Sequence, residues 1–359
     1  MKEVSAAPKI TNVKAAILGF QHLLAMYSGD VLVPLLIGAA LHFSQEQLTY
    51  LVSIDIFMCG IATFLQLKRT PLTGIGLPVV LGCAVQAVNP LIQIGKTYGL
   101  GTMYGSIIGA GIFIFLIAGL FSKIKNLFPP VVTGSLITII GFTLIPVAFQ
   151  NLGGGDTSAK DFGNLQALGI GFLTIAIILL ISVFARGFMK SVSILIGILV
   201  GTLIAGAMGM VSLKPVAEAS WFHLPTLFYF GTPHFEWSSI LTMILVSLTT
   251  MVESTGVFFA LGDITGRKIE GDDLKRGYRA EGIAVILGGL FSTFPYSTFS
   301  ENVGVVQLSG VKTRKPIYFS AAFLVVLGLL PKIGALATII PDPVLGGAMV
   351  VMFGIVGIQ

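Results

Sequence analysis

The chain has 359 residues, of which 55% are hydrophobic and only 10% are charged, and its formal net charge is +5. Soluble domains carry roughly 25% charged residues, so this composition excludes a soluble protein built around one large core. The basic residues lie in short loops between apolar segments, which argues against a nucleic-acid partner. The mean hydropathy of +0.95 predicts a chain that resides in a lipid bilayer.

Apolar segments close to the roughly 20 residues that cross a bilayer follow one another along the chain. Twelve such segments occupy residues 15–41, 47–67, 75–94, 99–121, 129–149, 163–185, 190–212, 238–262, 279–294, 296–310, 316–337 and 341–359. The tenth is short and interrupted. The N-terminus shows no cleavable signal. We therefore predict an all-α, polytopic membrane protein with twelve spans.

The basic residues divide unequally between the two sets of loops. If the N-terminus is cytoplasmic, 17 of the 21 Lys and Arg residues lie on the inside, and only Lys96, Lys160, Lys214 and Lys332 lie outside. Cytoplasmic loops of membrane proteins carry an excess of Lys and Arg. This distribution favours a cytoplasmic N-terminus.

Two pairs of matching stretches occur in the same order. Residues 119–124 (GLFSKI) and 328–333 (GLLPKI) agree at four of six positions, and residues 128–134 and 340–346 then open another span in each copy. The loop at 123 is expected inside and the loop at 332 outside, so the copies are inverted. Such repeats place a substrate site near the bilayer midplane. Chance similarity between Gly- and Leu-rich membrane segments is the alternative.

The repeat also indicates that two spans lack partners. It sets an offset of seven spans, so the segments at 163–185 and 190–212 have no counterparts before Gln359. We therefore expect a C-terminally shortened form of a fourteen-span protein, which binds or transports poorly by itself. A genuine twelve-span protein is the alternative.

Ionisable side chains inside apolar spans are costly and are candidates for function. These candidates are His22, Asp30, Asp55, Glu253, Glu281 and Glu301, accompanied by the amides Gln86, Asn89 and Asn302. Spans three and ten are both interrupted by Gly and Pro, and interrupted spans at matching positions of two halves point to a transporter's binding site. For each candidate, a structural hydrogen bond or a position near the lipid headgroups is the alternative.

The sequence shows no pattern typical of an enzyme. Residues 95–97 (GKT) match the end of a phosphate-binding loop, but the glycine required five residues earlier is Pro90. There is no H-E-x-x-H motif and no metal-spaced set among the four histidines. Cys59 and Cys83 lie inside apolar segments, which argues against a disulfide framework or a Cys-based metal site. We expect no catalytic activity, no cofactor and no metal.

Several motifs together resemble one transporter family. Residues 300–314 (SENVGVVQLSGVKTR) are similar to the signature of the nucleobase/ascorbate transporter family, also called nucleobase:cation symporter-2, which is Gln/Glu-Asn-x-Gly followed by Thr-Arg. Gln21 and His22 resemble its Gln-His pair, and residues 252–256 (VESTG) resemble its acidic motif on span eight. Residues 294–299 (FPYSTF) are similar to those of bacterial xanthine permeases. The chain is therefore identified as a member of this family.

The resemblance implies a fold of two intertwined, inverted seven-span repeats. They form a core domain, here residues 1–125 and 238–337, and a gate domain, here residues 126–237 and 338–359. It also implies a proton-coupled secondary transporter that takes up a purine nucleobase, xanthine above all, across the bacterial cytoplasmic membrane. A uracil permease and an anion transporter of the same fold are the alternatives. A homodimer is one assembly open to such a protein.

The resemblance also assigns roles to individual residues. The implied substrate-binding residues are Glu253, Glu301, Asn302, Gln86 and His22, and the implied proton-coupling residues are Glu253 and Glu281. Many relatives have a second ionisable residue four positions after Glu253, where this chain has Val257. An acid at position 301 is found in uracil transporters and a Gln in purine transporters, so Glu301 leaves the choice of base open.

Overall fold

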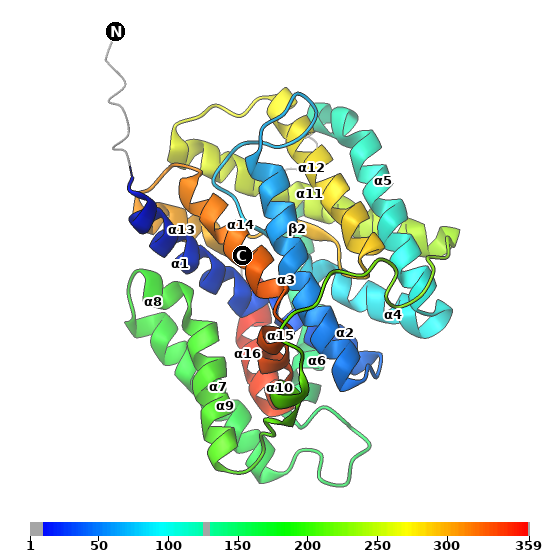
Figure 1. Ribbon diagram of the computed structural model, residues 1–359, viewed down its shortest axis with the longest axis vertical. Helices are drawn as coiled ribbons and strands as arrows, with labels where there is room; N and C mark the ends of the chain where they lie inside the picture. The colour runs from blue at the N-terminus through cyan, green and yellow to red at the C-terminus, as the bar shows by residue number, and fades with distance from the viewer. Residues whose placement is uncertain (1–9, 125–129, 358–359) are drawn as a thin grey trace.

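The computed structural model describes residues 10–124 and 130–357 as an assembly of helices (Figure 1). The helices are α1 (Asn12–Asp30), α2 (Leu32–Ala40), α3 (Gln45–Leu67), α4 (Val88–Tyr98), α5 (Leu100–Ile124), α6 (Pro130–Leu152), α7 (Leu165–Phe184), α8 (Phe188–Ser191), α9 (Ser193–Ala207), α10 (Lys214–Glu218), α11 (Trp237–Thr265), α12 (Gly271–Leu290), α13 (Glu301–Ser309), α14 (Lys315–Gly328), α15 (Pro331–Thr338) and α16 (Asp342–Gly357). A 3-10 helix, η1 (Val85–Ala87), precedes α4. The predicted helical architecture is confirmed.

Several of these helices have the length and composition of membrane spans. Among the described residues, α1 with α2, α3, α5, α7 and α11 make five segments that are long and apolar enough to cross a bilayer. The pair α14 and α15, bent by 82° at its break, would make a sixth. The helices α9 and α16 are apolar but shorter. The count of twelve spans stays a prediction.

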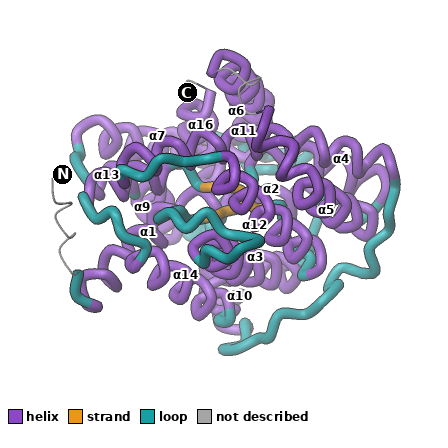
Figure 2. Tube along the Cα trace, turned by 90° about the horizontal axis from the view of Figure 1, so that it is seen from above, coloured by secondary structure: helices purple, strands orange, loops and turns teal. Residues whose placement is uncertain are grey.

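Two short strands interrupt spans three and ten, as the Gly and Pro residues there predicted. The strands β1 (Leu81–Cys83) and β2 (Tyr296–Thr298) pair antiparallel near the centre of the molecule (Figure 2), with Leu81 opposite Thr298 and Cys83 opposite Tyr296. Each strand leads into short helices, η1 and α4 after β1 and α13 after β2. The interrupted spans of the two halves therefore meet directly. The sequence indicated the interruptions but not the strand pairing.

The helices pack in two groups. In one group, α5 packs against α11 and α12, while α3 packs against α14, α15 and α12 and α1 packs against α14. In the other, α16 packs against α6, α7 and α9. The division of the chain into a core domain and a gate domain stays a prediction.

Glycines allow α5 and α12 to touch along their backbones. A Cβ atom at Gly111 would lie 2.7 Å from the backbone nitrogen of Ile286, and one at Gly282 would lie 2.8 Å from that of Phe115. Small residues give membrane helices this close approach. The contact fixes the part of α12 that carries Glu281, next to Gly282.

One segment predicted as a single span is bent. The segment at 316–337 bends between α14 and α15, where Pro331 begins the second helix and supplies no N–H for the helix before it. The segment at 15–41 is one apolar segment, in which the single residue Val31 separates α1 from α2. The helix α12 begins at Gly271, eight residues before the predicted start, because the polar first turn is capped by Glu270.

Candidate functional site

The side chains of Gln86 and Glu253 join the first interrupted span to α11. Gln86 lies on η1, directly after β1, and its Nε2 donates a hydrogen bond of 2.5 Å to Glu253 Oε2. Glu253 is half-buried in the middle of α11. It also interacts electrostatically with Glu301, the first residue of α13. The structure thus brings together three of the predicted substrate-binding residues.

His22 and Asn302 form a second pair, which joins α1 to the second interrupted span. His22 Nδ1 lies 3.0 Å from Asn302 Oδ1, and both residues are buried. The other amide atom of Asn302, Nδ2, is buried without a hydrogen-bond partner in the described structure. A buried donor without a partner is costly. Asn302 Nδ2 is therefore a candidate to donate a hydrogen bond to a ligand.

Glu281 lies on α12 beside this group and contacts it through residues of α11. It hydrogen-bonds to Ser254 and interacts electrostatically with Glu253. Ser254 also accepts a hydrogen bond of 3.0 Å from the hydroxyl of Thr298 on β2. Glu253 therefore contacts the first interrupted span through Gln86, and the adjacent Ser254 contacts the second interrupted span through Thr298. Ser254 and Thr298 were not predicted as site residues, although both lie in motifs that resemble the family's.

The arrangement suits a planar ligand with N–H groups beside carbonyl groups. The carboxylates of Glu253 and Glu301 can accept strong charge-assisted hydrogen bonds from ring N–H groups. The amide Nδ2 of Asn302 can donate to a carbonyl oxygen. Because Val257 is buried and apolar, the acids available to bind a proton in this part of α11 and α12 are Glu253 and Glu281.

The other ionisable candidates, Asp30 and Asp55, do not bond to these residues. Both are buried and hydrogen-bond to each other, and their other partners are Cys59, Cys83 and Tyr296. The sequence reasoning set the two cysteines aside because they lie in apolar segments. Only the folded chain shows that they face the two aspartates.

A cavity of about 580 Å³ lies elsewhere, at the start of α3. Its lining includes Tyr50, Ser53, Glu218 and Tyr229. None of the predicted site residues lines it. The cavity is therefore separate from the group around Glu253.

Comparison with known proteins decides the family. The model of a family described as the Permease family matches residues 13–359. The uric acid permease PucK of Bacillus subtilis is 56% identical over 339 residues, which cover 94% of this chain and 79% of PucK. The chain belongs to the nucleobase/ascorbate transporter family. It is therefore a transporter and not an enzyme, and it is a multi-pass bacterial membrane protein.

Further members of this family are also similar along most of their length. The xanthine permease of Bacillus subtilis is 55% identical over 96% of this chain and 78% of its own. The xanthine permease XanP of Escherichia coli is 32% identical over 93% of this chain and 75% of its own.

Solved structures confirm the fold. The transmembrane domain of the cyanobacterial bicarbonate transporter BicA matches with a TM-score of 0.70 at 17% identity, covering 97% of this chain and 90% of that domain. The murine anion transporter Slc26a9 matches with a TM-score of 0.66 at 11% identity, covering 98% and 65%. At these identities the likeness shows the inverted-repeat fold alone.

Proposed function

We propose that this member of the family is a proton-coupled transporter of an oxidised purine base, either xanthine or uric acid. The observation that carries the proposal is the group of Glu253, Gln86, Glu301 and Asn302, assembled from α11 and the two interrupted spans. Relatives named for uric acid and for xanthine are 56% and 55% identical to the chain. Because these values differ so little, the expectation of xanthine alone is widened to both bases.

The chemistry of both bases supports this proposal. Xanthine and uric acid carry ring N–H groups next to carbonyl groups, so acceptor carboxylates and donor amides are both needed. Glu253 and Glu301 supply acceptors, and Asn302 Nδ2 supplies a buried donor. A donor–acceptor pattern of this kind discriminates strongly against a base that lacks one of the groups.

Proton coupling is proposed on the same residues. Two interacting carboxylates in a water-poor site favour the uptake of a proton by one of them. Glu253 and Glu281 interact, and Glu281 Oε1 is buried without a hydrogen-bond partner in the described structure. A proton on this pair would remove one charge before the loaded site moves across the membrane.

The acidic site disfavours a small inorganic anion, although the fold is shared with anion transporters. Such an anion has no N–H group to donate to the carboxylates of Glu253 and Glu301, so nothing offsets the repulsion between like charges. A uracil permease is disfavoured only by the names of the similar proteins.

The proposal is tested by measuring the uptake of radiolabelled xanthine in cells that express the protein from its complete gene. Unlabelled bases are added as competitors. Unlabelled xanthine and uric acid should abolish the signal, whereas the same excess of uracil or sulfate should leave most of it. Competition by uracil as strong as that by xanthine would instead support the uracil permease.

A further inference from the structure

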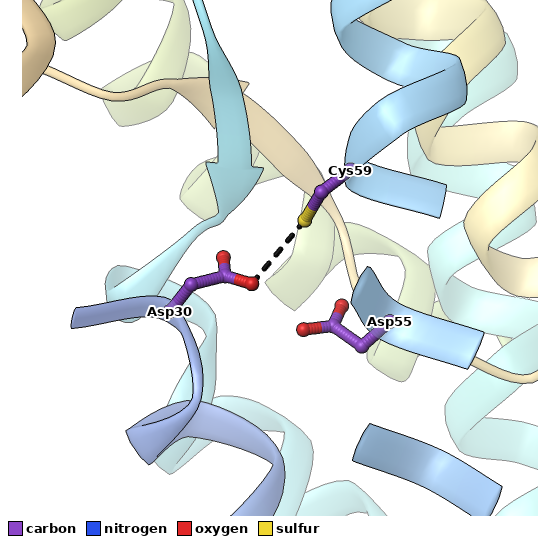
Figure 3. A group of neighbouring side chains, drawn as sticks. All are labelled: Asp30, Asp55 and Cys59. Carbon is purple, nitrogen blue, oxygen red and sulfur yellow. Dashed lines mark hydrogen bonds between the residues drawn. The ribbon is translucent and has the colours of Figure 1, made fainter. Parts of the chain in front are cut away.

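Four side chains with metal-ligand chemistry meet outside the proposed substrate site. Asp30 ends α1, Asp55 and Cys59 lie one turn apart on α3, and Cys83 ends β1. Figure 3 shows Asp30, Asp55 and Cys59 pointing toward one another from α1 and α3. Their exposed fractions are 1%, 1% and 0%, and that of Cys83 is 3%. The cluster is therefore shielded from water on all sides.

The two carboxylates lack a positive partner. The contacts that bear on Asp30 and Asp55 come from each other, the two thiols, a backbone N–H and the Tyr296 hydroxyl, with no Lys, Arg or His in the part of the chain that the structure describes. Burying an uncompensated carboxylate costs several kcal/mol. A pair of them therefore needs a cation or a proton between them.

The ligand atoms of three of these residues lie close enough together to surround one ion. One ligand atom each from Asp30, Asp55 and Cys59 lies within 4.8 Å of the others. Cys59 Sγ lies 3.3 Å from Asp30 Oδ2, and Cys83 Sγ lies 3.0 Å from Asp30 Oδ1 and 3.5 Å from Asp55 Oδ2. Ligands that bind zinc at 2.0–2.3 Å stand roughly 3.3–3.8 Å apart at the corners of a tetrahedron, and these three separations lie close to that range.

Groups outside the set orient its carboxylates. The Tyr296 hydroxyl donates to Asp55 Oδ1 at 2.8 Å, and the Cys83 backbone N–H donates to Asp30 Oδ1 at 2.6 Å. Gly82 leaves room for this approach, since a Cβ atom there would lie 2.7 Å from Asp30 Oδ1. Hydrogen bonds of this kind fix metal ligands and tune their affinity.

We propose that Asp30, Asp55 and Cys59 bind a divalent cation of the zinc class, and that Cys83, whose thiol contacts both aspartates, completes the ligand set. A divalent charge balances the two carboxylates, and thiol ligands favour zinc or cadmium over magnesium or calcium. Binding displaces the protons that the ligands otherwise carry. The ion joins α1, α3 and β1, and its ligand on β1, Cys83, lies three residues before Gln86. It thereby holds the first interrupted span in place.

The metal content of the purified protein tests this site. Protein from cells supplied with Zn²⁺, washed free of loosely bound ions, should retain about one zinc ion per chain. The variants C59S and C83S should retain roughly one tenth or less, and Y296F, which removes only the donor to Asp55, should bind zinc roughly 10–100-fold more weakly. The exposed D263N serves as the matched control and should retain zinc like the unsubstituted protein.

Cadmium gives a second readout that needs no variant. Cd²⁺ added to the unsubstituted protein should produce the ultraviolet absorption of a cadmium–thiolate bond, and a strong chelator should remove it. Absence of both zinc and this absorption would overturn the proposal and leave a shared proton between Asp30 and Asp55. Equal zinc in the protein and in all correctly folded variants would overturn it too, since that result indicates adventitious ions only.

Discussion

Glu253 and Glu301 bring two carboxylates together from helices α11 and α13, which are far apart in the chain. A change from Glu to Gln keeps the shape but replaces an acceptor-only group by one that also donates. We expect E253Q and E301Q each to reduce binding of xanthine and uric acid at least roughly 10-fold, the cost of a lost charge-assisted bond. Binding of radiolabelled base to the purified protein measures this effect.

The exposed Glu218 provides the control for both variants. E218Q removes the same charge, but it does so far from the group around Glu253. It should bind the bases like the unsubstituted protein. If E253Q and E301Q both bind every base normally at equal expression, neither carboxylate contacts the ligand.

The pair of His22 and Asn302 orients an amide whose Nδ2 is free to donate. In H22Q a side-chain donor remains for Asn302 Oδ1, whereas H22L removes it and leaves the buried oxygen unpaired. We expect H22L to raise KM for uptake roughly 10-fold or more, and H22Q to lie between H22L and the unsubstituted protein. Equal uptake kinetics in H22L and the unsubstituted protein would exclude an orienting role for His22.

At this scale the sequence indicated most of the group, because ionisable residues within apolar spans are rare. It identified His22, Gln86, Glu253, Glu281, Glu301 and Asn302. It could not show that Ser254 links Glu281 to Thr298, because hydroxyl side chains are common in membrane helices. It also set Cys59 and Cys83 aside, since both lie inside apolar segments.

At the scale of elements, the close packing around the pair of strands β1 and β2 depends on Gly82. A Cβ atom there would lie 2.7 Å from Asp30 Oδ1 and 3.0 Å from the ring of Phe299. Overpacking of this kind costs about 1–3 kcal/mol, so G82A should lower the thermal unfolding temperature. G169A on α7, where a Cβ atom would meet nothing within 4 Å, should not lower it. Equal unfolding temperatures for both variants would show that a Cβ atom at position 82 fits without strain.

Asp273 in the first turn of α12 holds three arginines from different segments. Its Oδ1 lies 2.8 Å from Arg69, 2.7 Å from Arg267 and 2.8 Å from Arg276. The arginine side chains are 20–46% exposed, so water screens part of each ion pair. We therefore expect D273N to cost roughly 1–3 kcal/mol, less than the loss of a fully buried pair.

The pH dependence of this contact has a definite sign. Burial raises the pKa of Asp273, but the hydrogen bonds from Arg276 and Glu270 and the charges of Arg267 and Arg69 outweigh it, so the pKa lies below its ordinary value of 3.8. The stabilisation is present in full above that ordinary value and is lost as the pH falls toward the lowered pKa of the folded state. Thermal unfolding at pH 7 should therefore separate D273N from the unsubstituted protein, with D263N as control. An equal unfolding temperature at pH 7 would contradict this account.

The bend in span eleven was not predicted from hydropathy for a physical reason. Hydropathy measures whether a segment prefers the bilayer and not whether its axis is straight. The local signal for this bend is the missing N–H of Pro331.

At the scale of the whole molecule, the two helix groups and the paired interrupted spans agree with transport by movement of one group against the other. The predicted inverted repeat is confirmed by the likeness to BicA and Slc26a9. The orientation in the membrane, the number of spans and the coupling ion stay predictions. These three properties are defined relative to a membrane, and measurements on the protein in a membrane test them.

Accumulation of base by proteoliposomes under an imposed pH gradient tests the central claim most directly. With the protein expressed from its complete gene and the outside acidic, we predict that xanthine or uric acid accumulates above its external concentration. A protonophore should abolish this accumulation, and E253Q should not show it, because binding and coupling share that carboxylate. Accumulation that a sodium gradient drives without any pH gradient, or that E253Q retains in full, would contradict the account.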